Sequence, residues 1–192
     1  MRYFGSGSPI LFAAVLASAG FLDAQDRTLQ IDPARTTVEF TLGAVLHTVH
    51  GTFHLVSGRM SFDPATGRAA GELVVDAASG QTGNDSRDKK MHTSVLESAR
   101  FPRIVFQPDR VEGAVAGQGI SKARLHGWFE IHGERHEMLV PLEVHASAAE
   151  YEATATFSVP YVKWGMKNPS TFVLRVEDHV ELTVHTVAGI GR

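Results

Sequence analysis

The stretch Ser121–Val144, S-K-A-R-L-H-G-W-F-E-I-H-G-E-R-H-E-M-L-V-P-L-E-V, restricts the possible folds more than any other part of the chain. Apolar and polar residues alternate on both sides of a break at Gly133. Side chains of a strand point alternately to opposite faces, so this pattern predicts an antiparallel hairpin. Its apolar face, which must cover either a packed core or a hollow, collects Leu125, Gly127, Phe129, Ile131, Met138 and Leu142.

Similar alternation recurs along most of the remaining chain. Tight turns are predicted at Ser57-Gly58 and at Asp63–Gly67, where proline and glycine suit turn geometry. The predicted strands are Leu29–Ile31, Thr37–Gly43, Val49–Val56, Arg59–Phe62, Ala69–Ala77, Arg103–Gln107, Tyr151–Val159 and Asp178–Val187.

The spacing of apolar residues changes from the strand period to the helical one between Ser79 and Ala99. Asn84 or Asp85 can cap a helix, and an apolar helical face is formed by Met91, Val95 and Leu96. One short helix, or two broken ones, therefore interrupts the strands. The chain as a whole reads as one all-β domain of about eight to ten antiparallel strands with a short helical insertion, either a barrel or a sandwich.

The N-terminal residues 1–24 have the pattern of an export signal. Arg2 supplies a positive charge, the apolar run Ile10–Leu16 follows, and cleavage is expected after Ala19 or after Ala24. A membrane anchor is the alternative, but Ile10–Leu22 has thirteen residues and a spanning helix needs about 20. We therefore expect a mature domain over residues 25–192, in the periplasm or secreted, with no stable membrane span.

Composition excludes several kinds of function. The chain has no cysteine, which rules out disulfides, thiolate metal sites and cysteine nucleophiles. Its net charge of −3 at pH 7 gives no sign of a basic surface for nucleic acid.

Ten histidines invite a search for a metal site, but their spacing does not favour one. His50 and His54 share a strand face roughly 13 Å apart, too far to share an ion. His132 and His136 flank a turn without an evident third ligand, so surface histidines are the better interpretation. The partial H-E-x-x-H motif at His136 has Val140 in place of the second histidine. We expect no metal, no cofactor and no catalytic set, and hence no enzyme.

The inward face is rich in phenylalanine, with glycines interspersed. An eight-stranded barrel is wide enough either to be filled by side chains or to hold one small ligand, and the pattern alone decides neither.

Several stretches occur in a characteristic order and spacing: T-V-E-F-T-L at 37–42, V-H-G-T-F at 49–53, S-G-R-M-S-F-D-P at 57–64, the polar segment around Arg87-Asp88, R-F-P-R-I-V-F at 100–106 and the hairpin at 125–142. Together they resemble the YceI-like family of exported bacterial lipocalin-like proteins associated with polyisoprenoid binding. The chain differs from the commoner pattern in its charged Glu134-Arg135-His136 turn and in the segment W-G-M-K-N-P-S at 164–170.

The resemblance implies an antiparallel lipocalin-like barrel of about eight strands with an apolar tunnel that holds a polyisoprenoid or similar amphiphilic lipid. Arg87 and Asp88 are the expected head-group contacts. Strand parity, not the family, selects the tunnel wall. The alternative function is that of a structural or stress-response periplasmic barrel with a filled core and no ligand. The sequence is also compatible with a homodimer. The expected ligand-contacting residues are Phe40, Phe53, Leu73, Met91, Phe106, Leu125, Gly127, Phe129, Ile131, Met138, Leu142, Phe157 and Trp164.

Overall fold

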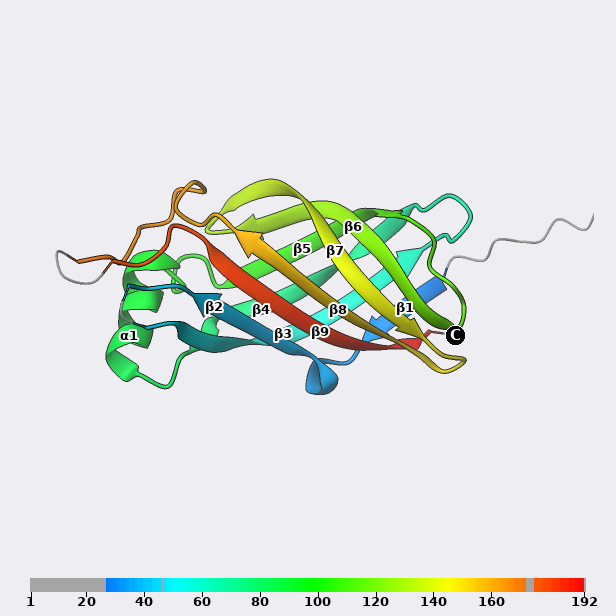
Figure 1. Ribbon diagram of the computed structural model, residues 1–192, viewed down its shortest axis with the longest axis horizontal. Coiled ribbons are helices and arrows are strands. Elements are labelled where there is room, and N and C mark those ends of the chain that lie inside the picture. Colours follow the sequence, from blue (N-terminus) through cyan, green and yellow to red (C-terminus); the bar gives the residue numbers. More distant parts are fainter. Residues whose placement is uncertain (1–26, 46, 172–174, 192) are drawn as a thin grey trace, which may run out of the picture.

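The computed structural model describes residues 27–45, 47–171 and 175–191. The predicted export signal, residues 1–24, lies outside these ranges. Within them the chain forms nine strands and a short helical segment (Figure 1). The strands are β1 (Arg27–Ile31), β2 (Thr37–Leu42), β3 (Val49–Phe62), β4 (Ala69–Gln81), β5 (Arg103–Glu112), β6 (Gly119–Ile131), β7 (Glu134–Ala146), β8 (Glu150–Val159) and β9 (Val180–Ile190).

All strand pairs are antiparallel, and the sheet closes on itself. β2 to β9 form a ring in which β3 pairs with β4, each later strand pairs with its successor, and β9 pairs back with β2. The all-β expectation and the count of about eight strands in the ring are confirmed, and the barrel is confirmed over the sandwich.

β1 and β2 occupy the same place in this ring. β1 pairs with the end of β3 and with β9, while β2 pairs with the beginning of β3 and with an earlier part of β9. Between them Asp32 caps a short 3-10 turn, η1 (Pro33–Arg35), through a bond from the backbone of Ala34. Proline cannot donate to a strand ladder, so the strand is divided into two segments at this point.

The turn predicted at Ser57-Gly58 is wrong, because β3 runs unbroken through it. Leu55 pairs with Val75 while Ser57 pairs with Val74, so one extra residue, Val56, bulges from the ladder. A bulge reverses the inward parity of the residues that follow. That reversal is the irregularity in the sequence pattern that resembled a turn.

The predicted hairpin is confirmed as β6 and β7, whose register holds from Gly119–Ala146 to Ile131–Glu134. The two residues of its turn, His132 and Gly133, have φ angles of 55° and 79°. Positive φ at both central positions is the geometry that matches the twist of the flanking strands.

The helical insertion is confirmed: it is a short α-helix followed directly by one turn of π-helix. Asn84 caps α1 (Asp85–Lys90), and η2 (Met91–Val95) continues as π-helix. α1 lies at one end of the barrel, together with the irregular segment 160–171, whereas β1 and the end of β9 lie at the other (Figure 1). We call these the α1 end and the β1 end. In the described residues, no helix is long and apolar enough to cross a membrane.

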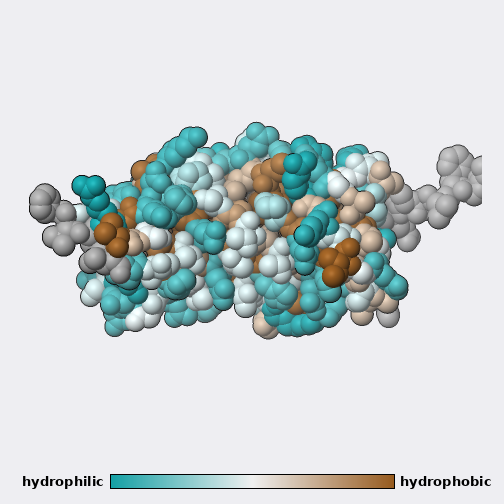
Figure 2. All heavy atoms as spheres, in the orientation of Figure 1, coloured by the Kyte–Doolittle hydropathy of each residue, from teal (hydrophilic) through white to brown (hydrophobic). Residues whose placement is uncertain are grey.

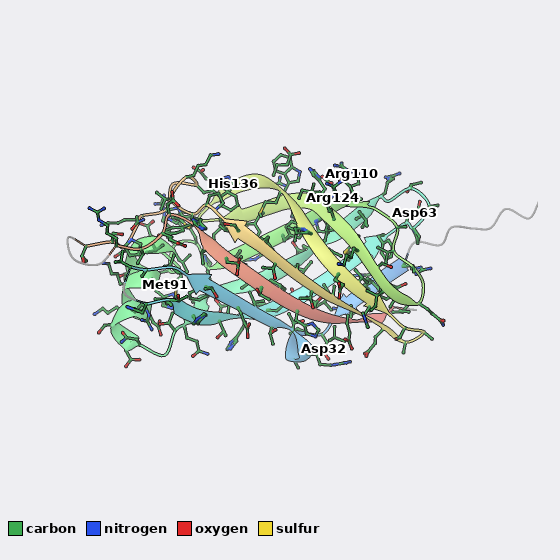
Figure 3. The ribbon with its side chains drawn as sticks, viewed as in Figure 1. Asp32, Asp63, Met91, Arg110, Arg124 and His136 are labelled. Atoms are coloured by element: carbon green, nitrogen blue, oxygen red, sulfur yellow. The ribbon has the colours of Figure 1, made fainter. Side chains whose placement is uncertain are left out.

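The outer face of the ring carries the polar residues. The face in Figure 2 is mainly hydrophilic, with hydrophobic side chains scattered singly. Glu112 pairs with Arg110 on its own strand, β5, at 3.0 Å and with Arg124 on β6 at 2.9 Å; both arginines are labelled in Figure 3. Exposed pairs of this kind contribute little to stability, so the fold depends on its inward face.

Candidate lipid-binding cavity

The interior of the ring holds an elongated apolar cavity of about 600 Å³. All nine strands and the helical segment contribute to its wall. Several inward side chains, among them Leu73, Phe106 and Phe157, are only half-buried although they point away from the outer surface. An eight-stranded ring is just wide enough to leave such space. The interior is therefore hollow.

Two clusters of buried side chains lie along the cavity. One, toward the β1 end, includes Leu29, Phe62 and Tyr151. The other, toward the α1 end, includes Phe129, Tyr161 and Met166. The space between and beside them is bounded by the inward residues of the strands.

The β1 end is closed by aromatic packing. Phe62 and Tyr151 are each 4% exposed and meet edge to face, with ring centroids 6.3 Å apart. The Arg27 guanidinium lies about 6 Å from both rings and donates to the Tyr151 hydroxyl. This arrangement favours entry of a ligand from the opposite end.

Ten of the thirteen side chains predicted to contact a ligand line the cavity. Strand parity was sufficient to place those on the strands, and the helical face placed Met91, which lies near α1 (Figure 3). They are Phe40, Phe53, Leu73, Met91, Phe106, Leu125, Phe129, Ile131, Leu142 and Phe157.

The structure places Gly127 outside the cavity wall. A Cβ added there would lie 2.4 Å from the Gln107 carbonyl oxygen, 2.8 Å from Pro108 Cα and 2.9 Å from Cζ of Phe106. The room beside Gly127 is thus occupied by the neighbouring strand β5 and by the Phe106 ring. Glycine permits this close approach; it does not widen the tunnel.

Met138 and Trp164 also lie outside the wall. Met138 pairs with Gly127 across the hairpin and packs against the cluster of the α1 end. Trp164 packs against Phe129, with ring centroids 5.9 Å apart, and stacks on His136 at 4.0 Å. Both pack against the cluster of buried side chains at the α1 end, and Met138 shares the inward face of β7 with Val140 and Leu142.

Arg87 and Asp88 have different places. Arg87 lines the cavity and also donates to Thr82, to the hydroxyl at 2.7 Å and to the carbonyl at 3.1 Å. The Asp88 carboxylate accepts from the Thr82 backbone and hydroxyl, away from the wall. Burial opposes its ionisation, but these bonds outweigh it and lower the pKa of Asp88. Asp88 therefore anchors the helix, and of these two residues only Arg87 lines the cavity.

Polar groups that sequence reasoning missed also line the α1 end. They are His47, Thr82, Ser86, Lys90 and Thr171. His47, Ser86, Lys90 and Thr171 are exposed to solvent as well, so this end is where the cavity opens. Helical spacing gave a signal for two of them: Lys90 lies three residues after Arg87 and four after Ser86, so it shares a side of the helix with each.

Two contacts join the segments around this opening. Lys90 Nζ donates to the Pro169 carbonyl at 2.7 Å, which links α1 to the 160–171 segment. The Tyr161 hydroxyl donates to the Glu177 carbonyl at 2.7 Å. Burial, with a smaller effect from the Asp178 charge, raises the pKa of Tyr161 to about 12, so it stays a donor at any physiological pH.

The interpretation of all histidines as solvated surface groups is wrong for His136. Its Nε2 is buried without a hydrogen-bond partner among the described residues. Burial lowers the pKa of His136, and the nearby Glu134 charge only partly opposes this. Within the described ranges, no three histidine or carboxylate side chains are close enough to hold a metal ion.

The sequence profile of the YceI-like domain matches residues 29–188. The chain belongs to the YceI-like family. Among proteins with curated descriptions, no sequence matches it.

Solved structures agree with this YceI-like fold. BcnA of Burkholderia cenocepacia superposes with a TM-score of 0.68 at 18% identity, over 82% of this chain and 98% of BcnA. A polyisoprenoid binding domain from Saccharophagus degradans gives 0.66 at 14% identity, over 85% and 98% of the two chains. The Campylobacter jejuni YCEI protein gives 0.60 at 16% identity, over 75% and 86%. At these identities the likeness concerns the fold.

Proposed function

We propose that this YceI-like protein binds, stores or carries a polyisoprenoid or similar amphiphilic lipid in its barrel. The observation that carries the proposal is the hollow interior. Its volume of about 600 Å³ lies within the range of small-molecule sites, and its wall is almost entirely apolar. A barrel with a filled core, the alternative from the sequence, predicts no such cavity.

The energetics suit a hydrocarbon tail. Removing roughly 400 Å² of apolar surface from water gives about 10 kcal/mol before the costs of binding are subtracted. No covalent step is needed, and the protein acts as a binder without catalysis. The name of the Saccharophagus degradans domain supports a polyisoprenoid as one ligand class.

The first test identifies the native ligand. Protein purified without detergent is extracted with organic solvent and analysed by mass spectrometry. We expect a long-chain lipid close to one equivalent per chain. An empty extract, together with no uptake of added prenyl lipid by the extracted protein, would contradict the proposal.

A matched pair of variants tests the place of binding. Ala155 lines the cavity midway along β8, and Thr154 beside it faces outward and is exposed. Ala155→Phe should fill the tunnel and lower lipid occupancy at least tenfold. Thr154→Phe adds the same ring to the outer face and should retain lipid. Equal occupancy in both variants would place the ligand elsewhere.

We also propose that the protein is exported and acts in the periplasm or outside the cell. The sequence pattern of residues 1–24 supports this. The intact mass of protein recovered from the periplasmic fraction should correspond to cleavage after Ala19 or Ala24. Recovery of the full-length chain from the cytoplasm only would refute it.

A further inference from the structure

The charged groups that line the cavity all have the same sign. No aspartate or glutamate is among the described residues of the wall, and its only permanently charged side chains are Arg87 and Lys90. The chain as a whole carries more acidic than basic groups, 21 against 18. The positive lining is therefore a local property of the opening and does not reflect composition.

Both cations belong to the opening. Arg87 and Lys90 lie three residues apart on α1, so they project from one side of the helix. Ser86 and His47 supply further hydrogen-bonding groups to the same part of the wall. An ammonium has three protons, of which the bond to Pro169 uses one. Lys90 can thus donate to a second acceptor without leaving α1.

The nearby carboxylates lie outside the cavity wall. Asp88 is bonded to Thr82, whose hydroxyl also accepts from Arg87, so Asp88 offsets part of the charge of Arg87 and leaves that of Lys90. Glu177 and Asp178 lie 3.5 and 3.1 Å from the ring nitrogens of His179, outside the lining. Within the described residues, neither Glu177 nor Asp178 forms an ion pair with Arg87 or Lys90.

From this asymmetry we infer that the ligand has an anionic head group, a carboxylate or a phosphate ester, held at the opening by Lys90 and Arg87 with its tail in the barrel. A neutral head such as an alcohol would leave both cations without a ligand partner. Hydrogen bonds from cations to carboxylate or phosphate oxygens are the stronger kind. The inference rests on the proposed tail site and specifies the class of lipid.

The test compares amphiphiles that share one tail. Extracted protein is titrated with hexadecanoate, hexadecyl phosphate and hexadecanol at low salt, below their aggregation concentrations. We expect the anions to bind about tenfold more tightly than the alcohol, with the advantage falling as salt is added. The carboxylate and phosphate arms tell which anion is preferred.

Two adjacent lysines provide the matched variants. Lys90→Gln should weaken anion binding about two- to fivefold and leave hexadecanol unchanged. Lys89, which is exposed and not part of the wall, should tolerate the same change without effect. Equal binding of all three probes, unchanged in Lys90→Gln, would overturn the anionic head group and leave the tail site intact. Binding of none of the probes would contradict the proposed function itself.

Discussion

At the scale of single residues, the cavity depends on which side chains are kept out of it. Gly127 leaves room on β6 for the Phe106 ring, which lines the cavity, and for the close approach of the β5 backbone. His136 and Trp164 stack with their planes 2° apart, and Trp164 packs against the Phe129 ring, which lines the cavity. These ring contacts fix the position of Phe129.

Gly127→Ala should destabilise the barrel. The added methyl meets backbone atoms of β5, which cannot move aside as a flexible side chain can, and overpacking of this kind costs about 1–3 kcal/mol. Urea unfolding measures the loss. Gly189, on β9, is the control, since a Cβ there has no heavy atom within 4 Å and Gly189→Ala should change stability by less than about 0.5 kcal/mol.

His136 should make the fold sensitive to acid. Its folded-state pKa is lowered, so its stabilising contribution is present above the unfolded-state value of about 6.5 and is lost as the pH falls from there through the folded-state pKa. Between pH 7.5 and 5.5, His136→Phe should therefore lose less unfolding free energy than the parent protein. Identical losses would show that His136 does not titrate differently on folding.

His126 provides the comparison of opposite sign. Hydrogen bonds from its ring to Asp109 and Glu137 raise its pKa, so its contribution is complete below about 6.5 and disappears as the pH rises through the folded-state value. His126→Gln should accordingly cost more stability at pH 5.5 than at pH 8.5.

At the scale of elements, α1 contributes side chains to the opening of the cavity. It is only six residues long and is held by the Asn84 cap, by Asp88 and by the Lys90 bond to Pro169. Few buried contacts secure it compared with the strands, so it should open locally more readily than the ring.

Asn84→Ala should loosen this segment without unfolding the barrel. Loss of an N-cap costs about 1 kcal/mol, which corresponds to roughly fivefold faster amide exchange in residues 85–95. Hydrogen–deuterium exchange measures it, and lipid release should accelerate in parallel. Asp32→Ala removes the equivalent cap of η1 and should leave exchange in α1 unchanged. Faster exchange across the whole ring would instead indicate global destabilisation.

The elements were predictable where alternation is strict. β6, β7 and β8 could be placed with their inward faces from the sequence alone. β3 could not be placed in this way. After the bulge at Val56, the inward positions change from odd-numbered residues such as Leu55 to even-numbered residues such as Met60, and in a sequence this change of parity resembles a turn. Ser86 and Lys90 at the opening were missed although Lys90 shares one side of the helix with Arg87, because polar residues on a helix have the same pattern whether they face solvent or a cavity opening.

At the scale of the whole molecule, the hollow is a property of the ring that no single position reveals. Small residues such as Ala153 and Ala155 on β8 line it together with larger residues on other strands. Whether side chains of these sizes fill the interior depends on the diameter of the ring. Composition and parity could therefore identify the wall, while the open volume required the three-dimensional arrangement. The same holds for the single sign of charge at the opening.

The shared position of β1 and β2 has a consequence for the order of folding. Both segments pair with β9, so the first and last strands of the sheet complete each other's hydrogen bonds. Such pairing has high contact order, which slows folding to milliseconds or longer. Until β9 docks, β2 and β8 expose unpaired edges that are open to intermolecular association. A nascent chain thus stays vulnerable to aggregation until β9 has been synthesised and can pair, and a holding chaperone would act in that interval.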